Sequence, residues 1–145
     1  MNQVVFIHHI FFIQLTFLLI FHFNIPRFIQ PNTNHSTLRV IYLNNVCIGD
    51  EHIHLITQIM SNSPKLESIV LSSNKITCKG AQDLSHSLHF CPDLNELNLS
   101  NNRIQDEGMI AISNALSYDI SLTHLDLSNN FITSKSVKVI IDISR

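Results

Sequence analysis

Four segments of the chain begin with the same apolar pattern, and they follow one another at a constant interval. The segments are LRVIYL at 38–43, LESIVL at 66–71, LNELNL at 94–99 and LTHLDL at 122–127, and the differences 66 − 38, 94 − 66 and 122 − 94 are all 28. Self-similarity at such a period is typical of a solenoid of stacked units, not of a globule around one closed core. The sequence therefore predicts an α/β solenoid with repeats at 38–65, 66–93, 94–121 and 122–145.

Each repeat combines two apolar periodicities. Apolar residues first alternate, which predicts a short strand with one buried face, and an isoleucine anchor follows at Ile48, Ile76, Ile104 and Ile132. The spacing then changes to three and four, which predicts one face of a helix: Ala81, Leu84 and Leu88 in the second repeat, and Met109, Ile112 and Leu116 in the third. Acidic pairs at 50–51 and 106–107 favour the positive end of that helix, and Pro64 and Pro92 end it.

Two further columns suggest how the repeats connect. Asn74, Asn102 and Asn130 recur just after the strand, where an amide can both donate to and accept from backbone groups of neighbouring turns. We expect them to form a ladder, with a less well satisfied turn in the first repeat, where Val46 stands instead. Gly80 and Gly108 share one position, where we expect the backbones of adjacent helices to approach closely.

The segment 1–30 differs from the repeats in composition. Arg27 is its only charged side chain, and the run from Val4 to Phe23, which has no formal charge, is long enough to cross a bilayer. A cleavable signal peptide is disfavoured, because the start lacks Lys or Arg and bulky residues occupy the cleavage zone. Three interpretations stay open: a membrane anchor, a segment that covers the open end of the solenoid, or a spurious start. Residues 31–37 read as a linker.

The strands predict a candidate binding surface. In each strand, the residues between the buried positions point to the face that the helices leave free, which should be the concave face of the solenoid. The predicted partner-binding columns are Val40, Ser68, Glu96 and His124; Tyr42, Val70, Asn98 and Asp126; and Asn44, Ser72, Ser100 and Ser128. The first two columns vary from repeat to repeat while the buried positions hardly change, which is consistent with a recognition surface.

Other chemistry finds little support. The chain holds 9 Lys and Arg against 11 Asp and Glu, without the basic excess expected of a nucleic-acid binder. His86, His89 and Cys91 form the most metal-like cluster, but no second paired motif completes a zinc site. The three scattered cysteines contain no CxxC and are typical of a reducing compartment. We expect no enzymatic activity, cofactor, metal or small-molecule substrate, because a solenoid lacks an enclosed pocket.

The segments at 94–104 and 122–132, together with Glu107, Gly108, Met109, Ile112 and Leu116, resemble leucine-rich repeats of the ribonuclease-inhibitor-like class. They are similar to the C-terminal repeats of NOD-like receptors. The resemblance implies a right-handed α/β horseshoe, with a parallel sheet on the concave side and helices on the convex side, in an intracellular protein. The chain lacks a phosphate-binding GxxxxGK[ST] loop, and the fourth repeat stops within its expected helix, so we expect a fragment of a longer protein.

These observations favour a non-catalytic module that binds a protein through the concave face, in a cytoplasmic adaptor or sensor. One alternative is a membrane-tethered receptor or scaffold anchored by residues 4–23. Another is a small-GTPase regulator, by analogy with the repeats of the Ran GTPase-activating protein.

Overall fold

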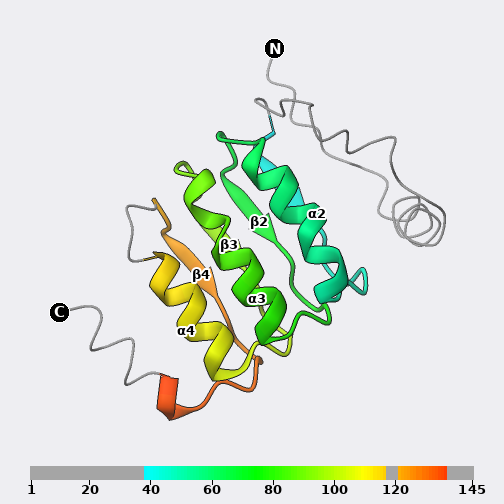
Figure 1. The fold of residues 1–145 in the computed structure, drawn as a ribbon, viewed down its shortest axis with the longest axis vertical. Coiled ribbons are helices and arrows are strands. Elements are labelled where there is room, and N and C mark those ends of the chain that lie inside the picture. Colours follow the sequence, from blue (N-terminus) through cyan, green and yellow to red (C-terminus); the bar gives the residue numbers. More distant parts are fainter. Residues whose placement is uncertain (1–37, 117–120, 137–145) are drawn as a thin grey trace.

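The computed structural model describes residues 38–116 and 121–136 (Figure 1). Short strands alternate with helices along the chain. They are β1 (Val40–Tyr42), α2 (Asp50–Ser61), β2 (Ser68–Val70), α3 (Cys78–Ser85), the 3₁₀ helix η1 (Leu88–Phe90), β3 (Glu96–Asn98), α4 (Gln105–Leu116) and β4 (His124–Asp126). The predicted hydrophobic segment 1–30 and linker 31–37 lie outside the described residues. Within the described ranges, no helix is long and apolar enough to cross a membrane.

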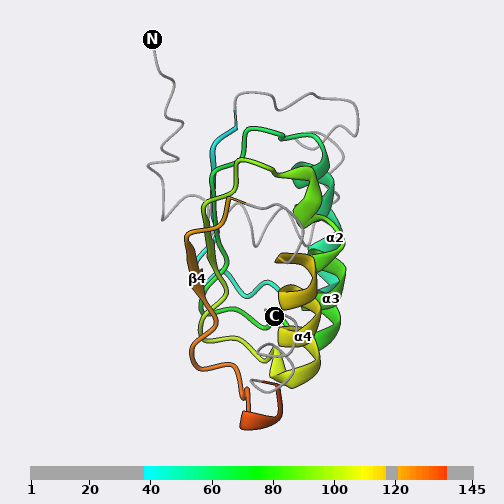
Figure 2. The ribbon, with the colours of Figure 1, turned by 90° about the vertical axis from the view of Figure 1, so that its left-hand side faces the viewer.

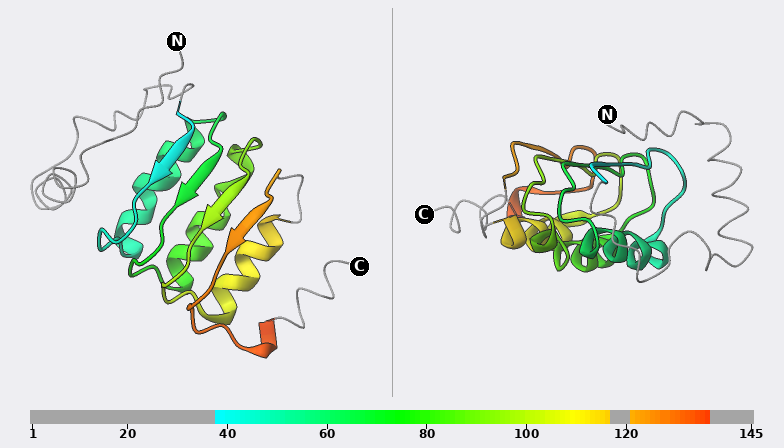
Figure 3. Two further views of the ribbon diagram at one scale, coloured as in Figure 1. Left: turned by 180° about the vertical axis from the view of Figure 1, so that it is seen from behind. Right: turned by 90° about the horizontal axis from the view of Figure 1, so that it is seen from above.

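The strands form one parallel sheet in the order β1-β2-β3-β4. Paired residues are separated by one repeat, so that Ile41 pairs with Ile69, Ile69 with Leu97, and Leu97 with Leu125. The helices lie in a second layer that covers one face of this sheet, while no described helix lies on the other face (Figures 2 and 3). This arrangement confirms the predicted α/β solenoid.

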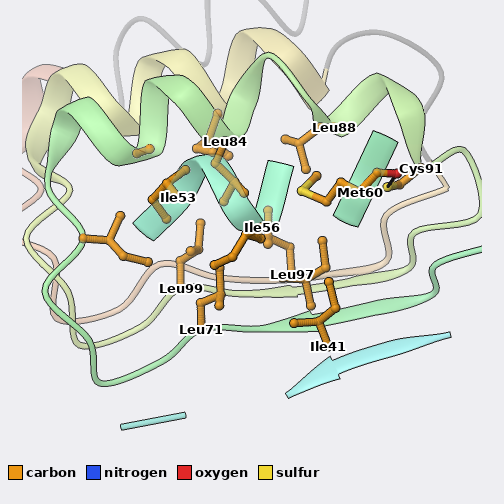
Figure 4. Packing of buried hydrophobic residues seen from close by; sticks show 14 of the residues in the cluster. Ile41, Ile53, Ile56, Met60, Leu71, Leu84, Leu88, Cys91, Leu97 and Leu99 are labelled. Carbon is orange, nitrogen blue, oxygen red and sulfur yellow. Dashed lines mark hydrogen bonds between the residues drawn. The ribbon is translucent and has the colours of Figure 1, made fainter. Parts of the chain in front are cut away.

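The core fills the space between the two layers. Ile41, Leu71, Leu97 and Leu99 point from the sheet toward Ile53, Ile56, Met60, Leu84 and Leu88 on the helical side (Figure 4). The isoleucine anchors Ile48, Ile76 and Ile104 are buried, as the periodicity predicted. Because each strand and each helix presents its apolar residues to the same layer, the repeats share one continuous core.

The fourth repeat departs from this pattern. Leu125 is 41% exposed, and Leu127 and Ile132 are only partly buried, although the repeat predicts all three in the core. Among residues 38–116 and 121–136, no strand pairs with the outer edge of β4, so these side chains have a neighbour on one side only. Burial in a solenoid thus depends on both neighbours, which the alternation within one strand does not reveal.

The helix of the second repeat is also shorter than predicted. It ends at Ser85, and Leu88, expected on the same helix face, lies in the separate helix η1, where it is nonetheless fully buried. The Ser85 hydroxyl donates to the carbonyl of Gln82 at 2.6 Å, a local bond that competes with helical hydrogen bonding. The leucine thus keeps its place in the core although the α-helix ends before it.

The predicted asparagine ladder is present. Asn102 Nδ2 donates to the carbonyls of Leu71 and Leu99 at 3.0 and 2.9 Å, and its Oδ1 accepts from the Ile76 amide at 3.1 Å. Asn74 and Asn130 make the corresponding bonds to the repeats before them. Each amide thus joins two repeats through buried backbone groups.

The first repeat, which carries Val46 instead of an asparagine, is bonded from the second repeat: Asn74 Oδ1 accepts from the Val46 amide at 3.1 Å. Asn74 also donates within its own turn, to the carbonyls of Leu71 and Ser72, and the apolar Val46 side chain cannot make the corresponding bonds. The first turn is therefore served by its neighbour but has fewer bonds of its own.

A third column stands one residue before the ladder and was not anticipated. Asn45, Ser73, Asn101 and Asn129 all adopt a left-handed backbone, with φ between 55° and 56°. Asparagine tolerates this conformation better than most residues. The run of Asn-Asn pairs at 101–102 and 129–130 is the sequence signal that could have revealed it.

The two repeat glycines lie where adjacent helices meet, as expected. A Cβ atom at Gly108 would stand 3.1 Å from the Cα of Cys78 and 3.0 Å from the Cβ of Ala81, both in α3. A Cβ at Gly80 would meet Ile53 of α2 at 3.1 Å. Only a residue without a side chain permits this helix spacing.

Candidate functional site

The twelve predicted face residues lie on one surface, because the sheet register aligns them in rows across the strands. Val40 pairs with Ser68, Ser68 with Glu96, and Glu96 with His124. The next row on the same face is Tyr42, Val70, Asn98 and Asp126, and the row after the strands is Asn44, Ser72, Ser100 and Ser128. The residues between them, such as Ile41, Ile69 and Leu97, are buried in the core against the helices, so the two rows within the strands lie on the opposite face of the sheet.

The β1 side of this face is apolar and exposed. Val40 is 50% exposed and Tyr42 is 64% exposed, on either side of the buried Ile41. Val70, which pairs with Tyr42 in the register, is only 8% exposed, so it offers little surface to a partner itself. Large apolar side chains left in water on a sheet face are informative, because the core does not need them there.

The middle of the face is polar and self-satisfied. The Ser68 hydroxyl donates to Glu96 Oε2 at 2.6 Å, the Ser72 hydroxyl donates to Asn44 Oδ1 at 2.8 Å, and the Ser100 hydroxyl donates to Asn98 Oδ1 at 2.8 Å. These three serines are buried between larger neighbours. They therefore position the side chains around them more than they offer contact area of their own.

The β3–β4 side is acidic. Glu96 and Asp126 are partly buried, and His124, which faces Glu96 in the register, is exposed. Hydrogen bonds from the Ser128 side chain and amide, aided by the Ser100 hydroxyl, hold the pKa of Asp126 below its ordinary value. The carboxylate is therefore ionised at neutral pH and fixed in direction, since the Ser128 amide donates to Oδ1 at 2.9 Å.

Two ion pairs join residues that lie just before the strands of adjacent repeats, and the sequence did not lead us to expect them. Arg39 Nη1 lies 2.8 Å from Glu67 Oε1, and Lys65 Nζ lies 3.1 Å from Asp93 Oδ2. Both pairs join residues 28 apart, so opposite charges at equal repeat positions were a signal that could have found them. The pairs are exposed and contribute little to stability.

A second link between repeats lies where the helices begin. Asp50 accepts from the Thr77 amide at 2.8 Å and from its hydroxyl, and Asp106 accepts from the Thr133 amide at 2.7 Å. The acidic residues predicted to favour the helix start therefore also bind the following repeat. Hydrogen bonds from Thr133 and then Ser136 lower the pKa of Asp106.

The metal-like cluster is split by the fold. Cys91 is buried, with its thiol directed to the Met60 carbonyl at 3.7 Å, while His86 and His89 are exposed on the helical side. Burial raises the pKa of the Cys91 thiol to about 11, which opposes the thiolate that a metal would require. In the described part of the chain, no group of three His, Cys, Asp or Glu side chains is placed to hold a metal.

Comparison with known proteins identifies the repeats. A family model described as "Leucine Rich repeat" matches residues 62–85 and 90–113, and a second, described as "Leucine Rich Repeat", matches residues 121–142. No curated protein matches the chain. The protein therefore carries leucine-rich repeats, and its two layers are the solenoid that such repeats build.

Two solved structures show the same fold at low sequence identity. One, titled "Leiomodin-1 Actin-Binding Site 2 (ABS2)", has a TM-score of 0.67 and 22% identity over 76% of this chain. The chain spans 65% of that structure. The other is the tropomodulin C-terminal domain of Caenorhabditis elegans, with a TM-score of 0.59 and 14% identity, covering 78% of this chain and 86% of that one.

Proposed function

We propose that this chain is a non-catalytic module that binds a protein through the open face of its sheet. The observation that carries the proposal is the exposure of Val40 and Tyr42 on a face that also carries fixed polar groups. Exposed apolar side chains rimmed by ordered polar groups are typical of protein-binding surfaces. Tyrosine is also among the residues that most often dominate binding energy.

The finer proposal is a cytoplasmic adaptor or sensor whose concave face receives the partner, as in the NOD-like receptors that the repeats resemble. The free cysteines Cys47, Cys78 and Cys91 are consistent with a reducing compartment. Actin is the defined protein to examine first, since one structure of similar fold is an actin-binding site of leiomodin-1.

The small area of the open sheet face limits the affinity that we expect for a protein partner. Four strands at a spacing of about 4.8 Å span roughly 14 Å, a face of a few hundred Å². A standard interface buries about 800 Å² on each partner. We therefore expect weak binding by this face alone, or a contribution to a larger surface.

The test is to pan the full chain against a library of random linear peptides, and to measure its binding to monomeric actin by biolayer interferometry. If the sheet face binds, Tyr42→Ala should weaken the selected ligands by about tenfold or more, because an aromatic anchor contributes about 2 kcal/mol. Phe90→Ala is the matched control, since Phe90 is also an exposed aromatic residue but lies in η1, outside the sheet. Ligands that respond equally to both variants, or to neither, would contradict the proposal.

A further inference from the structure

We propose that the sheet face selects a protein segment that carries an aliphatic or aromatic side chain together with a lysine or arginine. The apolar side chain would contact Val40 and Tyr42, and the cation would contact Glu96 and Asp126. This inference rests on the proposed function and names the chemistry of the partner.

The apolar half offers a shallow but defined contact. Val40 and Tyr42 are two residues apart in β1 and therefore project from the same face. Val70 lies beside Tyr42 on the neighbouring strand β2, because the two residues are paired in the register, and it is buried. An incoming apolar side chain can thus cover the exposed valine and the tyrosine ring at once.

The acidic half holds negative charge that the described residues do not compensate. Within residues 38–116 and 121–136, Arg39 pairs with Glu67 and Lys65 with Asp93, and the His52 ring lies beside Glu51. No described nitrogen of a Lys, Arg or His side chain therefore lies within 4.0 Å of a carboxylate oxygen of Glu96 or Asp126.

The two carboxylates are also preorganised. The Ser68 hydroxyl holds Glu96 at 2.6 Å, and the Ser128 amide holds Asp126 at 2.9 Å. They belong to adjacent strands, at diagonal positions of the register, since Glu96 faces His124 and Asp126 stands two residues further along β4. With neighbouring strands about 4.8 Å apart and a rise of about 3.3 Å per residue, the backbones of diagonal neighbours lie roughly 8 Å apart, so one cation above the face is attracted by both carboxylates.

The sheet geometry also fixes the spacing of the partner's side chains. From β1 to β3 is two strand spacings and from β1 to β4 is three, or roughly 10–14 Å. An extended peptide rises about 3.3 Å per residue, so a segment crossing the strands would place its cation three or four residues from its apolar side chain.

The experiment uses the same peptide library and the full chain. We expect enrichment of peptides in which Lys or Arg stands three or four residues from Leu, Ile, Phe, Tyr or Trp. The double variant Glu96→Gln, Asp126→Asn keeps the shape of both side chains while removing their charge. It should weaken the best selected peptide by about tenfold and reduce the salt dependence of its binding.

A matched control is the double variant Glu107→Gln, Asp83→Asn, which removes the same charge from exposed helix residues and should leave the peptide's affinity unchanged. Circular dichroism melting of all variants establishes that each one is folded. Light scattering of the unliganded chain tests whether a second copy occupies the face instead.

The possible results distinguish a failure of the proposed function from a failure of this inference alone. If no peptide is enriched and actin does not bind, both the proposed function and this inference fail. If no peptide is enriched but actin binds through Tyr42, this inference fails while the proposed function stands. If peptides bind through Tyr42 but lack the cation and ignore the double variant at 96 and 126, this inference fails while the proposed function stands. A dimer that Tyr42→Ala dissociates would show that a second copy of the chain is the occupant, and would also overturn the inference.

Discussion

Asparagine amides connect the repeats at the scale of single residues. The amide group of Asn102 meets backbone groups of two repeats at once, all of them buried: the carbonyls of Leu71 and Leu99 and the amide of Ile76. An asparagine side chain suits this position because it carries both a donor and an acceptor at a fixed separation. Aspartate would keep only the acceptor, and leucine would keep neither.

We predict that Asn102→Ala lowers the free energy of unfolding by roughly 2–4 kcal/mol, because each buried polar group left without a partner costs about 1–3 kcal/mol. Urea denaturation of the full chain followed by circular dichroism measures the loss. Asn95→Ala is the control: Asn95 is exposed, its bonds to neighbouring strands come from its backbone, and the change should stay within about 0.5 kcal/mol. If both variants lost the same free energy of unfolding, the ladder hydrogen bonds would contribute no more than an exposed asparagine side chain.

The helices are held at their spacing by glycine. Gly108 of α4 faces the start of α3, and an added methyl group would meet Ile104 Cγ2 at 2.6 Å and the backbone of Cys78 at 3.1 Å. The isoleucine could adjust its side chain, but a backbone atom can give way only if the two helices separate.

Gly108→Ala should therefore destabilise the chain by about 1–2 kcal/mol, since overpacking against a backbone atom, about 2–3 kcal/mol at the upper end of the usual range, outweighs the gain of about 1 kcal/mol in helix propensity. Thermal melting measures the effect. At Gly49, by contrast, an added methyl group would meet only the flexible, exposed Glu51 carboxylate. Gly49→Ala should cost no more than about 0.5 kcal/mol, through a weaker helix cap. A neutral Gly108→Ala would indicate that α3 and α4 can move apart freely.

The Asp106–Thr133 link makes the stability of the repeats depend on acid. Hydrogen bonds from Thr133 and Ser136 lower the pKa of Asp106 from its ordinary 3.8. The carboxylate therefore contributes stability above about pH 4, and this contribution is lost as the pH falls through the lowered value. We predict that Asp106→Asn or Thr133→Val makes the fall in melting temperature below pH 4 shallower. Ser134→Ala, at an exposed position beside the link, should keep the parent slope.

The sequence predicted the helices, strands and strand register better than the burial of individual side chains. The constant interval between repeats predicted the strand register correctly, because stacking aligns equal positions in successive repeats. It could not predict that Ser68 is buried while Val40, at the same repeat position, is half exposed. That difference comes from the neighbouring strands: Ser68 lies between two of them, and among the described strands Val40 has one.

The same limit applies to the candidate site. Which strand residues share the face followed from alternation alone, and the register aligns the eight of them that lie in β1–β4. Their division into apolar and acidic halves depends on hydrogen bonds such as Ser68 to Glu96, which join residues of different repeats. A single repeat contains no information about such contacts, because the partner lies one full repeat away.

The whole molecule behaves as a stack in which each repeat contacts its neighbours in one standard way. The hydrogen bonds of the ladder and of the aspartate–threonine links join residues 26 to 31 positions apart. We predict that deletion of residues 66–93 yields a chain that folds with the same circular dichroism shape but lower stability, because Asn102 can then serve the turn that Asn74 serves now.

Deletion of residues 66–79, half of the same repeat, is the comparison. It should abolish cooperative unfolding, because it removes β2 and the start of α3 and leaves the rest of α3 without a strand of its own repeat to pack on. If both deletions fold equally well, or neither folds, the repeats are not interchangeable in the way their contacts suggest.

The constant interval between contacting residues has a consequence for heredity. When slippage in DNA replication gains or loses one whole repeat in frame, the chain that results brings together neighbours that already match. Length can therefore change in a single mutational step, and the open face of the sheet can widen or narrow with it, without any compensating substitution in the core.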